Sequence, residues 1–274
     1  MKNKKNLLVS SVIAAHNEEA DLELCIKSLL KQSHDPLEII IVENGESTDK
    51  TLEIAKDYAK KYKNIKALSL PGKQRGPGNA WNFGIKDAKG KIIHICGADL
   101  RYGKDYVKEG IKSIISGKNK GVVHNHELCA NLKNLWARAF FKERPFVDEK
   151  GFGKVFTLVD KDYVKANPFD SRLGYADDQT IYLRDGIMFP GVEVEVYHNN
   201  PSSFKQVWAH ASWVGKSMKR PLLVIILMPL LPLYAIYKTL KHLQKDFYLP
   251  FIFLPIYYSM RYIAYFKEAI KKIF

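Results

Sequence analysis

The chain has 274 residues and carries 43 lysines and arginines against 29 aspartates and glutamates, which gives a formal net charge of +14. Its composition, 46% hydrophobic and 26% charged, is typical of a globular protein and excludes an intrinsically disordered one. The cysteines Cys25, Cys96 and Cys129 are widely spaced and odd in number, so they predict buried thiols in a reducing compartment rather than a disulfide framework or a zinc site.

The beginning of the chain is basic, but it does not have the pattern of a secretory signal. The apolar run that follows residues 1–6 is short and lacks a small-residue cleavage pattern. We therefore expect the amino-terminal region to be cytoplasmic.

The first hundred residues alternate between apolar runs and amphipathic segments. The apolar runs at 7–14, 38–42, 65–70 and 92–96 predict four strands. Between them, the residues 22–30, 52–62 and 80–88 carry apolar side chains at helical spacing and predict three helices. Asn17 is a candidate N-cap for the first helix. This alternation indicates βαβ units with right-handed crossovers, and therefore a mainly parallel sheet flanked by helices.

Two common nucleotide-binding motifs are absent from this region. Neither the GxGxxG fingerprint nor the GxxxxGK[ST] loop occurs in it. Gly76-Pro77-Gly78 precedes a predicted helix, but it is only a weak phosphate-loop signal because turns before helices use the same residues.

The fourth predicted strand ends abruptly in Gly97, Ala98 and Asp99. In open α/β sheets, ligands gather outside the carboxyl ends of the strands, where Asp99 is expected to lie. A carboxylate there can hold a divalent cation, and the cation can hold a diphosphate. The alternative is that Asp99 only caps the next loop, as aspartate does at many strand ends.

Beyond Asp99 the alternation becomes irregular. The residues 122–123, 154–159 and 192–196 are strand-like, and the residues 132–141 have a helical pattern. Asp177 and Asp178 stand at a predicted helix start, where a favourable interaction with the helix dipole is the ordinary explanation for aspartate. We therefore expect one mixed sheet rather than a second doubly wound domain.

Five segments carry a family resemblance, in the order SVIAAHNEE at 11–19, VENGESTDKT at 42–51, GPGNAWNFGIKDAKG at 76–90, CGADL at 96–100 and ADDQTIYLR at 176–184. In this order they resemble five landmarks of the family 2 glycosyltransferases. The first two are the opening strand with its Asn-Glu-Glu turn and the Asp-Asp-Gly-Ser-Thr-Asp motif. The others are the Gly-Pro, Ala-Arg-Asn and Ala-Lys-Gly segments, the Asp-x-Asp motif and the Glu-Asp motif. The members of this family are inverting enzymes of the GT-A fold that use nucleoside-diphosphate sugars. The similarity extends over about residues 7–215.

The resemblance implies that an acceptor hydroxyl displaces a nucleoside diphosphate from an anomeric carbon. It implies that Asp178 is the catalytic base, that Glu43 recognises the nucleotide base, and that Asp99 coordinates Mg²⁺ or Mn²⁺, with Lys73 or Arg75 as helpers. Asp177 is expected to organise the helix start or the acceptor. The residues expected to bind substrate or nucleotide are Ala15, Asn17, Glu18, Glu43, Asn44, Arg75, Gly76, Asn79, Ala98 and Asp177.

This sequence departs from the family pattern at three places. Gly97 replaces the first acid of the Asp-x-Asp motif, so Asp99 alone remains to hold the cation. Glu46 is an additional residue in the second motif and Glu43 is longer than the usual aspartate, which leaves the nucleotide base open. The Gln-x-x-Arg-Trp motif of processive synthases is not reproduced after Gln206, which favours a single transfer per acceptor.

Two apolar stretches, 221–237 and 247–266, lie near the end of the chain between basic residues. Together with the net charge they favour a membrane surface as partner, and they divide the chain into a catalytic domain, 1–215, and membrane-associated helices, 216–274. Basic residues between the stretches, and Arg261 within the second, favour a shallow interfacial helical hairpin with the catalytic domain facing the cytoplasm. A two-pass hairpin and a pair of buried core helices remain alternatives. The anchor suggests a lipid-linked acceptor, such as a polyprenyl-phosphate or its glycan.

Three other classes of protein compete with the glycosyltransferase interpretation. A sugar nucleotidyltransferase shares this kind of sheet, but it would favour a glycine-rich loop with a basic residue after the first strand, which AAHNEE is not. A catalytically silent, membrane-bound nucleotide-sugar binding module is suggested by Gly97. A nucleic-acid binder rests on net charge alone, and no nucleic-acid-binding motif is present, so we expect no nucleic-acid partner.

Overall fold

The chain divides into two compact units. The computed structural model describes residues 7–45, 47–71, 76–141, 147–148, 150–243 and 253–274. The first unit comprises Met1–Leu128 with Phe146–His198, and the second comprises Cys129–Pro145 with Asn199–Phe274. The predicted boundary after residue 215 falls near the end of helix α9 (Phe204–Lys216), inside the second unit.

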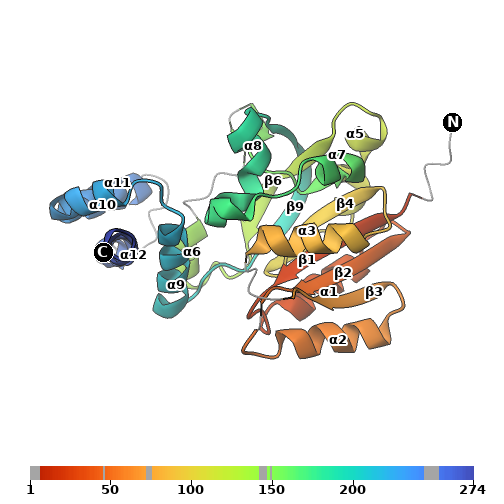
Figure 1. Ribbon diagram of the computed structural model, residues 1–274, viewed down its shortest axis with the longest axis horizontal. Coiled ribbons are helices and arrows are strands. Elements are labelled where there is room, and N and C mark those ends of the chain that lie inside the picture. Colours follow the sequence, from red (N-terminus) through yellow and green to blue (C-terminus); the bar gives the residue numbers. More distant parts are fainter. Residues whose placement is uncertain (1–6, 46, 72–75, 142–146, 149, 244–252) are drawn as a thin grey trace. The chain divides into compact units, whose positions relative to one another are not determined.

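The first unit is built on a mixed sheet (Figure 1). Its strands are β1 (Val9–Ala15), β2 (Leu37–Glu43), β3 (Ile65–Ser69), β4 (Ile92–Gly97), β5 (Leu100–Tyr102), β6 (Gly121–Cys129), β7 (Phe152–Gly153), β8 (Leu158–Asp160) and β9 (Phe189–His198). They follow the order β3-β2-β1-β4-β8-β6-β9-β5, with β7 paired to β9. The strands β1 to β4 pair in parallel, whereas β8 pairs antiparallel with β4 and β6, and β9 pairs antiparallel with β5 and β7. The predicted mixed sheet is confirmed, and β1–β4 form its parallel part.

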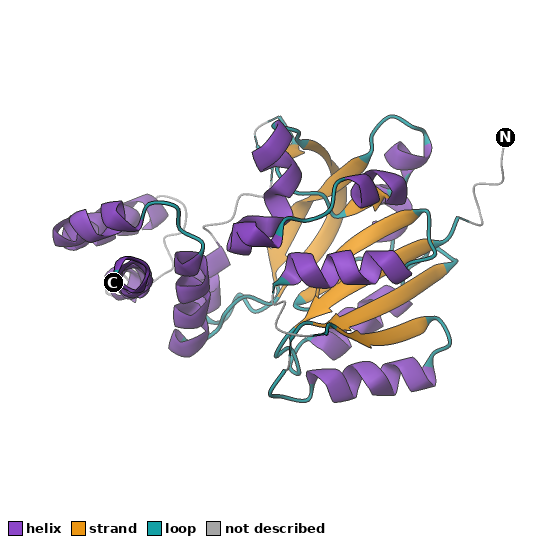
Figure 2. Ribbon diagram, in the orientation of Figure 1, coloured by secondary structure: helices purple, strands orange, loops and turns teal. Residues whose placement is uncertain are grey.

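Helices cover both faces of this sheet (Figure 2). They are α1 (Leu22–Leu30), α2 (Thr51–Lys61), α3 (Pro77–Asp87), α4 (Tyr106–Gly110), α5 (Lys112–Ile115), α7 (Lys161–Ala166), the 3₁₀ segment η2 (Ser171–Gln179) and α8 (Thr180–Asp185). The first three agree with the predicted helices to within a few residues. The short elements α4, α5, β5, β7 and α7 were not predicted, because they contain too few residues to show a period.

Both faces of the sheet are buried at β2. Ile39 and Ile41 of β2 belong to an apolar cluster that includes the inner face of α1, whereas Ile40 and Val42 belong to a second cluster with α3. This division follows from the two-residue period of a strand. Because side chains on both faces pack against helices, β2 is a nearly continuous apolar run, as is typical of parallel strands.

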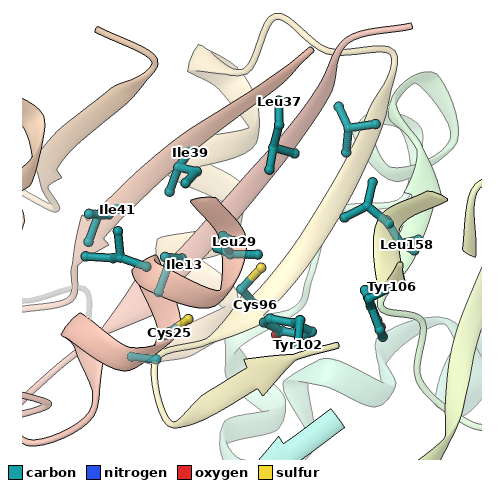
Figure 3. Packing of buried hydrophobic residues seen from close by; sticks show 14 of the residues in the cluster. Ile13, Cys25, Leu29, Leu37, Ile39, Ile41, Cys96, Tyr102, Tyr106 and Leu158 are labelled. Atoms are coloured by element: carbon teal, nitrogen blue, oxygen red, sulfur yellow. The ribbon is translucent and has the colours of Figure 1, made fainter. Parts of the chain in front are cut away.

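The first cluster also contains two of the cysteines (Figure 3). Cys25 and Cys96 are free and buried, and Cys129 is half-buried. Burial raises the pKa of the Cys25 and Cys96 thiols above their ordinary value, so both are neutral packing groups. The predicted burial is therefore confirmed for these two.

The second unit is helical. Its elements are α6 (Leu135–Phe141), α9, α10 (Pro221–Ile226), the 3₁₀ turn η3 (Met228–Leu230), α11 (Leu231–Leu243) and α12 (Phe253–Ile273). The predicted apolar stretch 221–237 is thus broken into short pieces, and residues 247–252 of the second stretch lie outside the described residues. Within the described part of the chain, no helix combines the length and the apolarity that crossing a membrane requires.

Arg261, in the middle of α12, is held by aromatic side chains of the same unit. Its guanidinium donates to the hydroxyls of Tyr257, at 3.2 Å, and Tyr265, at 2.9 Å. It also lies 5.7 Å from the centre of the Phe140 ring. These contacts accommodate a charge within an otherwise apolar stretch, because a guanidinium binds aromatic faces and hydroxyls together.

Candidate functional site

The site is built at the edge where the parallel strands end. Asp99 lies between β4 and β5, and the β5–β9 pairing places Leu100 opposite His198, the last residue of β9. This register brings Asp99 Oδ2 to 2.9 Å from His198 Nε2. Asp99 therefore faces an imidazole at the carboxyl end of β4, which is the position where ligands of open α/β sheets bind.

His198 is held from its other side by a buried glutamate of β6. His198 Nδ1 lies 2.6 Å from Glu127 Oε1, and Glu127 Oε2 lies 3.2 Å from His124 Nε2. All three side chains are buried. The result is an alternating row of Asp99, His198, Glu127 and His124.

The side chains of this row stabilise one another's charged forms. Burial alone would lower the pKa of His198, but the charge of Asp99 and the hydrogen bonds to Asp99 and Glu127 outweigh it and raise that pKa to about 9. Burial would likewise raise the pKa of Glu127, but the hydrogen bonds from His124 and His198 lower it to about 2. At neutral pH the arrangement is an imidazolium between two carboxylates.

Sequence reasoning missed this row except for Asp99. His198 stands two residues beyond the predicted strand 192–196, and nothing in the alternation of that strand marks it. The run HNHE at 124–127 is the one local signal, since histidine and glutamate are uncommon in a buried strand. Only the non-local pairing of β5 with β9 identifies His198 as the neighbour of Asp99.

Glu18, in the turn after β1, belongs to the same electrostatic environment. Burial and the nearby charges of Asp99, Asp21 and Asp49 raise the pKa of Glu18 to about 9. Glu18 is therefore protonated at neutral pH, in a region that it shares with several acids and with the His198 imidazolium. A cation bound there would relieve the repulsion among these acids.

Asp177 joins η2 to the first turn of α3. Its Oδ2 accepts a hydrogen bond of 2.7 Å from the Gly78 backbone N–H. Burial raises the pKa of Asp177 to about 6, although the backbone hydrogen bonds oppose this shift. A Cβ at Gly78 would lie 2.7 Å from the same oxygen, and Gly76 has φ +118°. The close approach of Asp177 thus explains the glycine at position 78, and the positive φ explains the glycine at position 76.

Asp178 follows directly and is half-buried. The segment around it is irregular, with Gly174 at φ 59° and Ala176 also outside helical geometry, and it is fixed by Thr180 Oγ1, which donates to the Asp177 carbonyl at 2.6 Å. Because α3 begins after the carboxyl end of β3, Asp177 anchors this segment at the same edge of the sheet that carries Asp99. Asp99 and the Asp177–Asp178 pair therefore lie at one edge of the sheet.

Asn17 connects the turn after β1 with the turn after β2. It adopts a left-handed conformation with φ 57°, and its Oδ1 accepts hydrogen bonds from the backbone N–H of Thr48, at 2.8 Å, and from its hydroxyl, at 3.2 Å. The prediction that Asn17 caps the first helix is wrong, since Asp21 is the N-cap of α1. The amide instead bonds a neighbouring loop, which local sequence reasoning does not reveal.

Glu43, at the end of β2, is buried inside its own turn. Its Oε1 accepts from the Ser47 backbone N–H at 2.6 Å and from the Ser47 hydroxyl at 2.9 Å, and its Oε2 accepts from the Ser69 hydroxyl at 2.9 Å. Burial would raise the pKa of Glu43, but these bonds lower it, so the group is a carboxylate. Its role in recognising the nucleotide base stays a prediction.

The remaining predicted positions are placed as follows. The Asn44 backbone N–H donates to the Ala15 carbonyl at 2.8 Å, which continues the β1–β2 pairing into the turns. Ala98 is buried beside Asp99, and Asn79 is half-buried in the first turn of α3. Arg75 and the alternative helper Lys73 lie outside the described residues.

Gly97 is in close contact with Asp99. A Cβ at position 97 would lie 2.7 Å from Asp99 Oδ1 and 3.5 Å from the Leu100 side chain. At the position where the Asp-x-Asp motif has its first acid, the Asp99 carboxylate therefore occupies the space that a side chain at position 97 would need.

Solved structures with the same fold contain nucleotide sugars. The chain superimposes on Staphylococcus aureus TarS 1–349 in complex with UDP-GlcNAc with a TM-score of 0.57, at 16% identity, over 97% of this chain and 92% of that one. It superimposes on the mannosyltransferase PcManGT from Pyrobaculum calidifontis, in complex with GDP-Man and Mn²⁺, with a TM-score of 0.54, at 17% identity, over 98% and 74% of the two chains. At these identities the similarity shows the fold.

The matches to curated relatives cover only part of each protein. A poly(ribitol-phosphate) beta-glucosyltransferase of Bacillus spizizenii is 30% identical over an alignment of 191 positions that covers 64% of this chain and 29% of the relative. A dolichyl N-acetyl-alpha-D-glucosaminyl phosphate 3-beta-D-2,3-diacetamido-2,3-dideoxy-beta-D-glucuronosyltransferase of Methanococcus voltae is 34% identical over 109 residues, or 38% and 33% of the two proteins. The chain thus spans about a third of the length of these relatives.

The family itself is identified by the sequence profile described as "Glycosyl transferase family 2", which matches residues 10–166, more than half of the chain. The match covers β1 to α7 and therefore includes the turns after β1 and β2, the start of α3 and Asp99. Together with the GT-A-like mixed sheet, it shows that this chain belongs to glycosyl transferase family 2.

Proposed function

We propose that this chain is an inverting glycosyltransferase that moves one sugar from a nucleoside-diphosphate sugar to a hydroxyl or phosphate of a glycan or lipid-linked acceptor. The observation that carries the proposal is the location of Asp99, His198 and the Asp177–Asp178 pair at one edge of the sheet. The nucleotide sugars bound to TarS and PcManGT support the donor class, and the names of the two relatives above support the acceptor classes.

Asp178 is the catalytic base in this proposal. Inversion requires the acceptor oxygen to attack the anomeric carbon from the face opposite the departing diphosphate, and its proton must leave as the new bond forms. A half-buried carboxylate next to the anchored Asp177 can accept that proton. Asp177 itself is engaged by Gly78, so its role is to hold the segment and, through it, the position of Asp178.

The residues around Asp99 fit a divalent cation. Asp99 supplies the carboxylate, and His198, which Glu127 holds through Nδ1, donates from Nε2 to Asp99 Oδ2 and so orients that carboxylate. No group of three or more metal-ligating side chains converges within the described residues, so the donor diphosphate would complete the set, as is common for Mg²⁺ and Mn²⁺. When bound, the cation neutralises charge on the leaving diphosphate.

Glu127→Gln is expected to weaken Mn²⁺ binding by about 10- to 100-fold, in the presence of nucleoside diphosphate. Glutamine has one carbonyl oxygen, so it cannot accept from both His198 and His124 as the carboxylate does. The readout is Mn²⁺ affinity by electron paramagnetic resonance titration. Glu195→Gln, an exposed position on the same strand as His198, is the control. Equal affinity in Glu127→Gln and wild type would contradict a positioning role.

Donor binding tests the proposed function directly. Calorimetric titration with UDP-Glc, UDP-GlcNAc, UDP-Gal and GDP-Man in the presence of Mn²⁺ is expected to identify at least one ligand. Slow release of the nucleoside diphosphate from that ligand, detected by a coupled phosphatase assay, would separate an enzyme from a silent binding module. If no nucleotide sugar binds, the proposal fails.

The membrane predictions stay proposals. We place the acceptor in or on a membrane and the catalytic unit on its cytoplasmic, anionic face, supported by the basic residues of the second unit. The family assignment replaces the nucleotidyltransferase alternative.

A further inference from the structure

The net charge of the chain is concentrated in one of its two units. By sequence, the second unit contains fifteen lysines and arginines against three aspartates and glutamates, whereas the first unit is close to neutral. The residues 196–245 contain no acid at all, and they contain Lys205, Lys216, Lys219, Arg220, Lys238, Lys241 and Lys245. A charge asymmetry of this size indicates a polyanionic partner or surface for the second unit.

The same unit exposes large apolar side chains along α10, η3 and α11, and we call the surface that they form the α10–α11 face. Its most exposed side chains are Leu233, at 65%, Ile226, at 62%, and Leu222, at 60%. The full set of exposed large apolar residues is Leu222, Leu223, Ile226, Leu227, Leu230, Leu233, Ile236, Tyr237 and Leu240. Successive spacings of three and four residues place most of them on one side of the helical path.

The opposite side of these helices packs on α12 of the same unit. Ala235 and Thr239 are buried there, and the Tyr234 and Tyr262 rings lie 5.3 Å apart. The Tyr262 hydroxyl also donates to the Val224 carbonyl at 3.1 Å. The inward side thus carries small and polar-tipped residues while the outward side carries leucine and isoleucine, the reverse of a helix on a water-soluble core.

Basic residues border this face at both ends. Lys216, Lys219 and Arg220 are exposed immediately before α10, and Lys241 is exposed next to Leu240 in α11. Burial lowers the pKa of Lys238, which lies 5.4 Å from the centre of the Tyr258 ring. An apolar strip with basic borders and no acids matches the boundary between acyl chains and anionic headgroups.

We propose that the α10–α11 face binds an anionic bilayer surface, with its leucine and isoleucine side chains at the level of the headgroups and upper acyl chains, and the basic residues in contact with lipid phosphates. A second copy of this chain is not expected to occupy this face, because two such faces would bring their basic borders together and repel each other. The inference deepens the proposed function, since it brings the enzyme to the surface that holds a lipid-linked acceptor.

Vesicle co-sedimentation tests the proposal with the full chain. Wild-type protein is expected to bind phosphatidylcholine vesicles containing phosphatidylglycerol and to bind pure phosphatidylcholine vesicles more weakly. Ile226→Ser with Leu233→Ser is expected to lower binding by about tenfold or more, because two exposed apolar side chains no longer leave water. The matched control, Leu24→Ser with Leu132→Ser, changes two exposed leucines outside the face and is expected to bind as wild type does.

A charge-reversed pair separates the electrostatic contribution. Lys219→Glu with Arg220→Glu is expected to lower binding to anionic vesicles by about tenfold or more and to leave binding to neutral vesicles unchanged. Its control is Lys56→Glu with Lys63→Glu, two exposed lysines of the first unit. Nucleotide-sugar binding in solution is expected to be equal in all four variants, so a failure here is distinct from a failure of the proposed function.

Three results would overturn the proposal. The first is that wild-type protein does not bind anionic vesicles. The second is that Ile226→Ser with Leu233→Ser and Lys219→Glu with Arg220→Glu both bind anionic vesicles as wild type does. The third is a stable dimer in light scattering that Ile226→Ser with Leu233→Ser dissociates, with no vesicle binding by either protein, which would assign the face to a second copy of the chain.

Discussion

Asp178→Asn is expected to reduce sugar transfer by about 10²- to 10⁴-fold while donor affinity stays within a few-fold of wild type. Asparagine has nearly the same size and fits the same half-buried position, but it cannot accept a proton from the attacking hydroxyl. The loss should therefore fall on turnover rather than on binding. Release of nucleoside diphosphate, in a coupled phosphatase assay, gives the first quantity, and calorimetric titration with the donor gives the second.

Two neighbouring aspartates make this test specific. Asp185→Asn changes an aspartate of the same segment that pairs with Arg184, so it should leave turnover unchanged. Asp177→Asn keeps a carbonyl oxygen that can still accept from Gly78, so its effect should be much smaller than that of Asp178→Asn. If Asp177→Asn abolished transfer and Asp178→Asn did not, the base would be Asp177 and the assignment made here would be wrong.

Asp99→Ala is expected to remove the dependence of donor binding on Mg²⁺ or Mn²⁺. In wild type, chelation with EDTA should weaken binding of the nucleoside-diphosphate sugar by about tenfold or more, equivalent to about 1.4 kcal/mol. In the variant, affinity with the cation and with EDTA should be equal and low, because hard divalent cations require oxygen ligands and Asp99 supplies the carboxylate at this position. Calorimetry under both conditions measures this difference.

The control for Asp99→Ala is a nearby aspartate with a different environment. Asp105 hydrogen-bonds Ser33 and lies 3.9 Å from Lys108, and it is exposed. Asp105→Ala should retain full cation dependence. Equal affinity of the wild type with the cation and with EDTA would show that donor binding needs no cation, and the proposed role of Asp99 would then fail.

The parallel part of the fold could be predicted because its information is local. Each strand from β1 to β4 is a short apolar run, and each following helix shows its own period, so β2 and α2 can be recognised without knowing their neighbours. The antiparallel part could not be predicted in the same way. The strand-like residues 122–123, 154–159 and 192–196 lie in or overlap β6, β8 and β9, but their bounds were missed, and β5, which is three residues long, depends on pairing with β9 rather than on a pattern of its own.

The candidate site shows the same division. Asp99, Asp177 and Asp178 were located from motifs, since each stands at a recognisable strand end or helix start. His198 and Glu127 were not, because histidine and glutamate on separate strands have no fixed spacing that predicts their contact. Asn17 was assigned to the wrong partner for a related reason, since a local cap and a bond to a neighbouring turn use the same side-chain oxygen.

The close packing of Gly97 against Asp99 restricts how this enzyme can evolve. A residue larger than glycine at position 97 would force the Asp99 carboxylate to rotate, because its β-carbon would come within 2.7 Å of Oδ1. That rotation would break the contact between Asp99 Oδ2 and His198 Nε2. An acid at position 97 is therefore expected to be tolerated only with an accompanying change at position 99.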